Sequence, residues 1–410
     1  MLLSLAMIFI IGSLAGWCFS KLRLPPLTGM LAAGIALGPC CLGLIDSSVL
    51  TISPQLRQIA LVIILLRAGL NLKLGDLKKV GRPAILMCFV PASFEIIGTF
   101  IAAPLLFGFS RADALVLGTV IAAVSPAVVV PHMLKLMDEG YGVEQGIPQM
   151  ILAGASADDV FVIVLFTSFT EMAQSGRFNA LGLLRIPTSI VLGAAAGALV
   201  GFVLRKLTQK TSADPSRAAL FLLSASFLLV ALESAATGAV GFSGLIAVMT
   251  SGLTFALGSE KSAAAVSNDL SRLWIGAEIL LFVLVGAAVD VSCAFDAGIR
   301  ALLLIPAALL FRMTGVLVCV AGTKLNRNER IFSMLAYTPK ATVQAAIGAI
   351  PLSLGFASGN TILTVAVVAI LVTAPLGAFM IDLTYKRLLR KKSAPPEREQ
   401  APAGKSKISG

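Results

Sequence analysis

Two adjacent aspartates, Asp158 and Asp159, lie in the middle of an apolar segment that runs from Pro148 to about Glu171. A segment of about 20 mostly apolar residues is long enough to cross a bilayer. An ionised carboxylate at bilayer depth costs at least about 2.5–3.5 kcal/mol on insertion scales, and a helix built only for packing needs neither of these two. Carboxylate oxygens are ligands for hard cations and acceptors for protons. The pair therefore predicts a site that handles cations or protons inside a membrane.

The composition agrees with a membrane location. The chain has 410 residues, of which 57% are hydrophobic and only 13% are charged, whereas about a quarter of the residues of a soluble domain are charged. Apolar runs separated by short polar loops predict an all-α polytopic membrane protein with about thirteen transmembrane helices. Their expected limits are 2–19, 27–44, 56–71, 83–108, 113–137, 148–171, 186–205, 217–235, 241–257, 273–290, 297–322, 331–356 and 360–383.

The basic residues predict the orientation. Most Lys and Arg residues of the loops fall on one side of the predicted spans, together with those of a Pro-, Gly- and Ser-rich segment over 386–410, which we expect to be a disordered cytoplasmic tail. The residues expected on the opposite side are Arg57, Arg111, Arg177, Arg185 and Arg300. Because cytoplasmic loops are the basic ones, we expect a cell (inner) membrane protein with its C-terminus in the cytoplasm and its N-terminus outside. The net charge of +11 then follows from topology, and no nucleic-acid partner is expected.

The chain also resembles itself at an offset of about 215 residues. The matched segments are 28–32 with 243–247, 91–92 with 306–307 and 125–130 with 338–343, and Glu95 and Arg312 follow the second match in each copy. This shift moves the chain by seven predicted spans, so the second copy is inverted relative to the first. The pattern predicts a transmembrane transporter domain over 1–385 with repeat 1 at about 2–171, a linker helix at about 186–205 and repeat 2 at about 217–383, as in many secondary transporters.

Prolines interrupt two spans at corresponding positions of the repeats, at Ser125-Pro126 and at Thr338-Pro339. Proline has no amide donor and clashes with the preceding turn, so each interruption frees backbone groups that need partners at membrane depth. We therefore expect two broken crossing helices beside the aspartates. The cation ligands expected in addition to Asp158 and Asp159 are the side-chain oxygens of Ser125, Ser156 and Thr338.

Three further ionisable residues are expected near the centres of their spans, namely Glu95, Arg312 and Lys340. Charges at this depth pair with one another or line a wet cavity. An intramembrane aspartyl protease and a cation channel are alternative functions for such a set. A protease needs two carboxyls that face each other, and neighbours on one helix point about 100° apart. Two opposed breaks favour alternating access over an open pore, so we expect a transporter rather than an enzyme.

The residues named so far resemble the monovalent cation:proton antiporters, most closely the NHA (sodium/hydrogen exchanger 9B-like) branch. The similar segments are 66–70 (LRAGL), 124–131 (VSPAVVVP), 156–159 (SADD) and 337–345 (YTPKATVQA). The resemblance implies an NhaA-like antiporter fold, a homodimer, and exchange of sodium or lithium ions for protons in pH homeostasis, with no cofactor. It also implies that a core domain moves elevator-fashion.

The same resemblance implies roles for the charged residues. Asp159 would be the main ion-binding carboxylate and Asp158 its partner in holding the metal ion, Na⁺ or Li⁺. Lys340 would pair with Asp158, and Glu95 and Arg312 would form a structural ion pair. Many other branches carry Thr-Asp where this chain has Ser125-Pro126.

Overall fold

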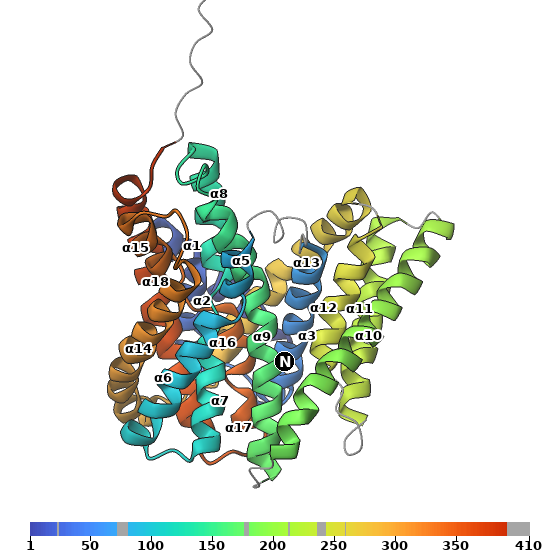
Figure 1. Ribbon diagram of the computed structural model, residues 1–410. Helices are drawn as coiled ribbons and strands as arrows, with labels where there is room; N and C mark the ends of the chain where they lie inside the picture. Colours follow the sequence, from blue (N-terminus) through green and yellow to red (C-terminus); the bar gives the residue numbers. More distant parts are fainter. Residues whose placement is uncertain are drawn as a thin grey trace, which may run out of the picture.

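The computed structural model describes residues 1–22, 24–71, 81–175, 180–211, 214–235, 243–258 and 260–391. Arg177, the side chain of Arg185 and the predicted tail from residue 392 onward lie outside this description. The described part is almost entirely α-helical and contains no strand, only one isolated bridge between Tyr141 and Lys391 (Figure 1). Polar residues start several helices. Ser110 accepts a hydrogen bond from Asp113 N at 3.0 Å, and Asn326 and Glu329 form a capping box.

The helices follow one another as the hydropathy predicts. The first half contains α1 (Leu2–Lys21), α2 (Pro26–Leu37), α3 (Ser47–Asn71), α5 (Arg82–Met87), α6 (Val90–Phe107), α7 (Arg111–Ala122), α8 (Pro126–Glu139) and α9 (Ile147–Ser175). The second half contains α10 (Ala180–Thr211), α11 (Pro215–Ala235), α12 (Gly244–Ala256), α13 (Glu260–Ala287), α14 (Val291–Cys319), α15 (Arg327–Ala336), α16 (Thr342–Ile347), α17 (Ile350–Ser353) and α18 (Gly359–Leu388).

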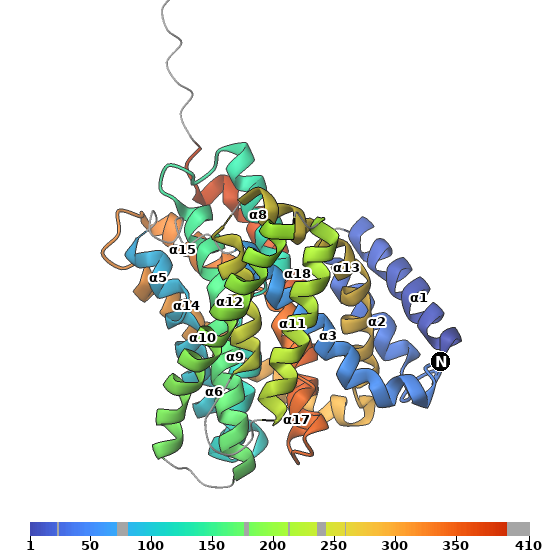
Figure 2. The same cartoon turned by 90° about the vertical axis from the view of Figure 1, so that its right-hand side faces the viewer.

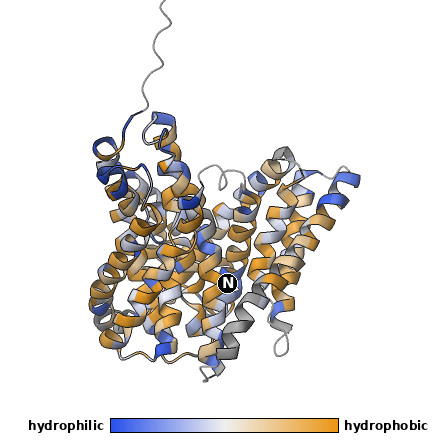
Figure 3. Cartoon of the chain, in the orientation of Figure 1, coloured by the Kyte–Doolittle hydropathy of each residue, from blue (hydrophilic) through white to orange (hydrophobic). Residues whose placement is uncertain are grey.

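Nine helical segments among the described residues are long and apolar enough to cross a membrane. Four shorter apolar helical segments overlap other predicted spans, namely Pro26–Leu37, Phe161–Gln174, Gly244–Ala256 and Thr342–Ser353. Hydrophobic residues cover most of the helices, and hydrophilic residues gather at the end where α8 and α15 lie (Figure 3). The number thirteen stays a prediction, because Pro26–Leu37, Gly244–Ala256 and Thr342–Ser353 do not by themselves reach membrane-spanning length. Phe161–Gln174 is part of the longer helix α9.

Two boundaries expected from the sequence are wrong. The third span begins at Ser47 instead of residue 56, so Arg57 lies inside α3 with only 6% of its surface exposed rather than in a loop. Polar residues and Pro54 dilute the hydropathy of the first turns of this helix, which hides its start. The predicted tail also begins too early, since α18 continues to Leu388.

Most of the helices belong to one of two bundles, as judged from the contacts between helices. One bundle packs α14 along α6, α7 against α6 and α9, and α18 against α14 and α15. The other packs α13 against α2 and α3, and α12 against α3, α10 and α11, with α1 beside α2. Figure 1 shows α14 and α15 far from α10 and α11, and Figure 2 shows α1 and α2 at the edge of the second bundle. We call these the α14 bundle and the α13 bundle.

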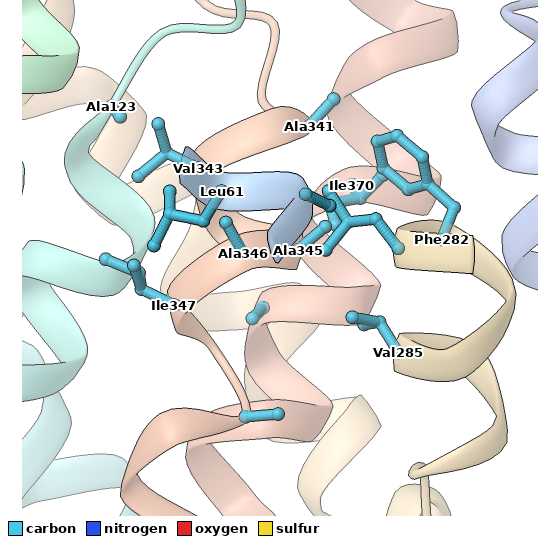
Figure 4. Packing of buried hydrophobic residues seen from close by; sticks show 14 of the residues in the cluster. Leu61, Ala123, Phe282, Val285, Ala341, Val343, Ala345, Ala346, Ile347 and Ile370 are labelled. Atoms are coloured by element: carbon cyan, nitrogen blue, oxygen red, sulfur yellow. The ribbon is translucent and has the colours of Figure 1, made fainter. Parts of the chain in front are cut away.

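The short helix α16 lies where the two bundles meet. It contacts α7 and α18 of the α14 bundle and α3 and α13 of the α13 bundle. Its apolar residues Val343, Ala346 and Ile347 belong to one buried cluster with Leu61 of α3 and Phe282 of α13 (Figure 4). This packing fixes α16, and with it the break that precedes α16, at the centre of the molecule.

Candidate functional site

The first break separates α7 from α8. Helix α7 ends at Ala122, the next three residues are not helical, and α8 starts at Pro126, whose missing amide hydrogen is no loss in the first turn of a helix. Ser125 has the extended backbone torsions φ −88° and ψ 112°. The break leaves several backbone carbonyls and amides of residues 121–125 without partners in their own helix.

The second break separates α15 from α16 and crosses the first. Residues 337–341, which include Pro339, lie between the two helices. Ser125 N donates a hydrogen bond of 2.8 Å to Pro339 O, so the two breaks touch through their backbones. Ala123 and Val343 belong to the same buried cluster (Figure 4), and the side chain of Gln344 donates to Ala123 O. The two predicted broken helices therefore cross as expected.

Side chains satisfy the carbonyls at the end of α7. Lys340 Nζ donates to Ile121 O at 2.5 Å, Arg312 Nη1 donates to Ala122 O, and Gln344 Nε2 donates to Ala123 O at 2.7 Å. The carbonyl end of a helix carries partial negative charge, which favours the two cations there. Three consecutive carbonyls thus receive donors from side chains of α14, the second break and α16.

Arg312 joins the second break to two carboxylates. Its Nε donates to Tyr337 O at 2.6 Å, its Nη1 lies 2.9 Å from Glu95 Oε2, and its Nη2 lies 2.9 Å from Asp158 Oδ2. All four side chains are buried. A guanidinium group has five N–H donors in a planar fork, which lets one side chain serve several acceptors. The expected contact between Glu95 and Arg312 is therefore present, but it is one part of a larger network.

The expected pairing of Lys340 with Asp158 is not what the structure shows. Lys340 Nζ lies 2.6 Å from Glu95 Oε1. Asp158 Oδ2 instead accepts hydrogen bonds from Arg312 Nη2 and from Val124 N, the latter at 2.8 Å. Arg312 takes the position beside Asp158 because its fork reaches Glu95 and Asp158 together, and Lys340 is left with the second oxygen of Glu95.

Asp159 stands apart from this network. Its side chain is 6% exposed, and its Oδ1 is buried without a hydrogen-bond partner among the described residues. The hydroxyl oxygen of Ser125 is also buried without a partner in the described part of the chain. Thr338 Oγ1 donates to Leu335 O at 2.8 Å and keeps lone pairs for a cation. Ser156 lies in α9, and its side chain falls outside the described residues.

Several contributors to the site were not expected from the sequence. Gln344 caps Ala123 O, and the hydroxyl of Thr373 accepts from Lys340 N at 3.0 Å. Tyr337 donates through its hydroxyl to Met87 O at 3.0 Å, and its ring lies 4.9 Å from the Arg312 guanidinium. The sequence did contain a signal for Gln344, because a side-chain amide in an apolar span, four residues after Lys340, needs a hydrogen-bond partner at membrane depth. Thr373 and Tyr337 had none, because both residue types are common in apolar helices.

The sequence also matches a family description. Residues 6–386 match the model of the transmembrane sodium/hydrogen exchangers. The chain belongs to the sodium/hydrogen exchanger family. It is 34% identical to sodium/hydrogen exchanger 9B2 of Homo sapiens over 388 residues, covering 90% of this chain and 70% of that protein. It is also 34% identical to human sodium/hydrogen exchanger 9B1 over 387 residues, covering 90% of this chain and 73% of that protein.

The fold agrees with a solved exchanger structure. The sodium proton antiporter MjNhaP1 from Methanocaldococcus jannaschii, determined at pH 8, superposes with a TM-score of 0.80 at 20% identity, covering 93% of this chain and 97% of that chain. This match confirms the predicted antiporter fold. Membership of the exchanger family makes the chain a membrane transporter and not an enzyme, so the aspartyl protease alternative is wrong.

Proposed function

We propose that the chain exchanges sodium ions, or lithium ions, for protons at Asp159. The observation that carries this proposal is the charge balance of the buried cluster. Glu95, Asp158 and Asp159 supply three carboxylates, whereas Arg312 and Lys340 supply two cations. If all five groups are ionised, one negative charge is left over. Glu95 and Asp158 lie against cations, so the unmatched carboxylate is that of Asp159.

Either a proton or a sodium ion on Asp159 removes the unmatched charge. An uncompensated carboxylate at membrane depth is costly, so the site is stable when one of the two ions occupies it. The two ions compete for the same oxygen atoms, and a site that moves only when occupied couples their transport in opposite directions. The oxygens of Ser125 and Thr338 and the side chains of Asp158 and Ser156 are the further ligands that we propose for sodium.

We propose that the two halves of the chain form an inverted repeat, and two close helix contacts support it. A Cβ atom on Gly34 of α2 would lie 2.1 Å from Val283 O of α13, and one on Gly252 of α12 would lie 2.7 Å from Leu66 O of α3. In sequence, Gly252 follows Gly34, and Val283 follows Leu66, by 217 residues to within one. Glu95 of α6 and Arg312 of α14, which form a buried ion pair, are also 217 residues apart. In the first contact the glycine lies in the first half of the chain and the carbonyl in the second, and in the other contact these roles are reversed. A two-fold relation between the repeats produces this reversal.

We propose further that the α14 bundle, which holds the site, moves against the α13 bundle in an elevator-type mechanism. In this proposal the α13 bundle holds the homodimer together and the C-terminus lies in the cytoplasm. The supporting observations are the sorting of helix contacts into two bundles and the excess of basic residues on the side of the tail. A cation channel would need no such division, because a pore conducts without moving its binding site.

The test is sodium-driven proton movement in proteoliposomes that contain an internal pH dye. Asp159→Asn keeps the shape of the side chain and removes its charge, so we expect sodium and lithium pulses to move no protons in this variant. The matched control is Asp138→Asn at an exposed position of α8, which should retain the exchange of the unaltered protein. Exchange at the unaltered rate in Asp159→Asn would refute the assignment. Sodium flux without proton movement in the unaltered protein would favour the channel.

A further inference from the structure

A cavity of about 530 Å³ opens at the outer side of the α14 bundle, away from the ion site. It lies between the end of α14 and the start of α15, two helices at the edge of the molecule in Figure 1. Its lining residues are Leu317, Leu325, Arg327, Arg330, Ile331 and Met334. Two arginines and four apolar side chains therefore share one space, and no carboxylate is among the described residues that line it.

The two arginines differ in how they are held. Arg330 Nε donates to Leu325 O at 3.1 Å and its Nη2 donates to Thr323 O at 3.2 Å, which fixes the guanidinium beside the turn between the helices. Arg327 is exposed at the start of α15. The guanidinium of Arg82 also approaches this turn, since its Nη1 would lie 3.9 Å from a Cβ atom on Gly322. Positive charge thus accumulates on one side of the cavity.

The nearest acidic residue of α15 is already engaged elsewhere. Glu329 is fully buried, its Oε2 accepts from Asn326 N at 2.8 Å, and its Oε1 lies 3.4 Å from Arg390 Nε. It faces the start of its own helix and α18 instead of the cavity. The arginines at the cavity therefore keep donors for an external anion.

The apolar side of the cavity indicates what kind of anion it takes. Leu317 is 42% exposed and Ile331 is 37% exposed, at the end of a membrane-spanning helix where acyl chains meet headgroups. We propose that this cavity binds an anionic phospholipid, whose phosphate lies against Arg327 and Arg330 and whose acyl chain lies along Leu317 and Ile331. Basic pockets between transmembrane helices are a known form of headgroup site, and a small soluble anion would leave the apolar surface uncovered.

The test uses the purified full-length protein, delipidated in detergent, with phosphatidylglycerol, phosphatidylcholine and inorganic phosphate as probes. Lipid binding is measured by native mass spectrometry and by the shift of Tm. We expect phosphatidylglycerol to bind and raise Tm, and Arg327→Gln to weaken this binding about fivefold, the loss of one basic contact at an anionic headgroup. Arg387→Gln makes the same charge change at an exposed position of α18 and should leave binding unchanged.

A second variant separates a lipid from a free anion. Ile331→Trp keeps both arginines and fills the apolar part of the cavity, so it should also weaken phosphatidylglycerol binding. The proposal is overturned if phosphatidylcholine binds as tightly as phosphatidylglycerol, or if Arg327→Gln and Arg387→Gln behave alike. It is also overturned if inorganic phosphate raises Tm as much as phosphatidylglycerol and Ile331→Trp has no effect, because the site would then hold a soluble anion.

Discussion

Glu95 is the residue on which both buried cations converge. Its two oxygens lie 2.9 Å from Arg312 Nη1 and 2.6 Å from Lys340 Nζ. Burial of a charge carries a desolvation penalty, and the attraction within a buried ion pair offsets this penalty only while both partners are present. Arg312 has a second carboxylate in Asp158, whereas Lys340 forms its ion pair with Glu95. The stability of the site therefore depends most on the Glu95–Lys340 contact.

Because of this contact, we expect the stability effects of two charge-removing substitutions, Glu95→Gln and Lys340→Gln, to be strongly coupled. Glu95→Gln leaves Lys340 without its carboxylate, and removing one partner of a buried pair typically costs about 3–5 kcal/mol. The double variant Glu95→Gln/Lys340→Gln should lose less stability than the two single variants together, with a coupling of about 0.5–3 kcal/mol. The measurement is Tm in detergent for all four proteins. Additive losses would show that the two side chains do not interact.

The sequence predicted the members of the charged cluster better than their pairing. Glu95, Asp158, Arg312 and Lys340 were recognisable because charged residues at the centre of apolar spans must meet. Pairing depends on how far each side chain reaches across helices α6, α9, α14 and the second break, which no residue pattern specifies. The likeness to the antiporters assigned one partner to each cation, whereas Arg312 serves two carboxylates and two carbonyls.

At the scale of the helices, small residues decide how closely α3 and α12 approach. A Cβ atom on Gly69 would lie 2.0 Å from Met249 O, a backbone atom that no side-chain rotation can move. Overpacking of this kind typically costs about 1–3 kcal/mol. We expect Gly69→Ala to lower Tm. In Gly298→Ala, by contrast, the added Cβ meets nothing within 4 Å in α14, and the helix propensity of alanine should keep or raise Tm. Equal Tm values for the two variants would contradict this close approach.

The helices themselves could be predicted to different degrees. Long apolar runs specified the long spans, and Pro126 and Pro339 marked both breaks, because the absence of an amide hydrogen acts locally. The start of α3 was missed where polar residues occupy a buried turn around Arg57. Helix α3 as a whole packs against α11, α12 and α13, and hydropathy along one helix contains no information on such packing.

At the scale of the whole molecule, the last described residues join the end of α18 to the end of α8 and to the turn that follows α8. Gly142 N donates to Arg390 O at 2.8 Å, and Tyr141 pairs with Lys391 in the isolated bridge. Leu389 is 5% exposed and packs against the turn at Gly142. Tyr385 OH donates to Glu139 Oε2 at 2.8 Å in the same region. The end of α18 thereby holds the end of α8, the helix that begins at the first break.

Shortened chains test whether this segment stabilises the bundle. A chain that ends at Lys391 keeps all of these contacts, so its Tm should equal that of the full chain. A chain that ends at Leu388 loses the buried Leu389, whose side chain contributes about 1.5–3 kcal/mol, together with the hydrogen bond from Gly142. Its Tm should be lower, and limited proteolysis should cleave the turn after α8 sooner. If both chains melt together, the segment does not hold α8. Helix α8 begins at the first break, so loss of the contacts that hold α8 should also slow ion exchange in the shorter chain.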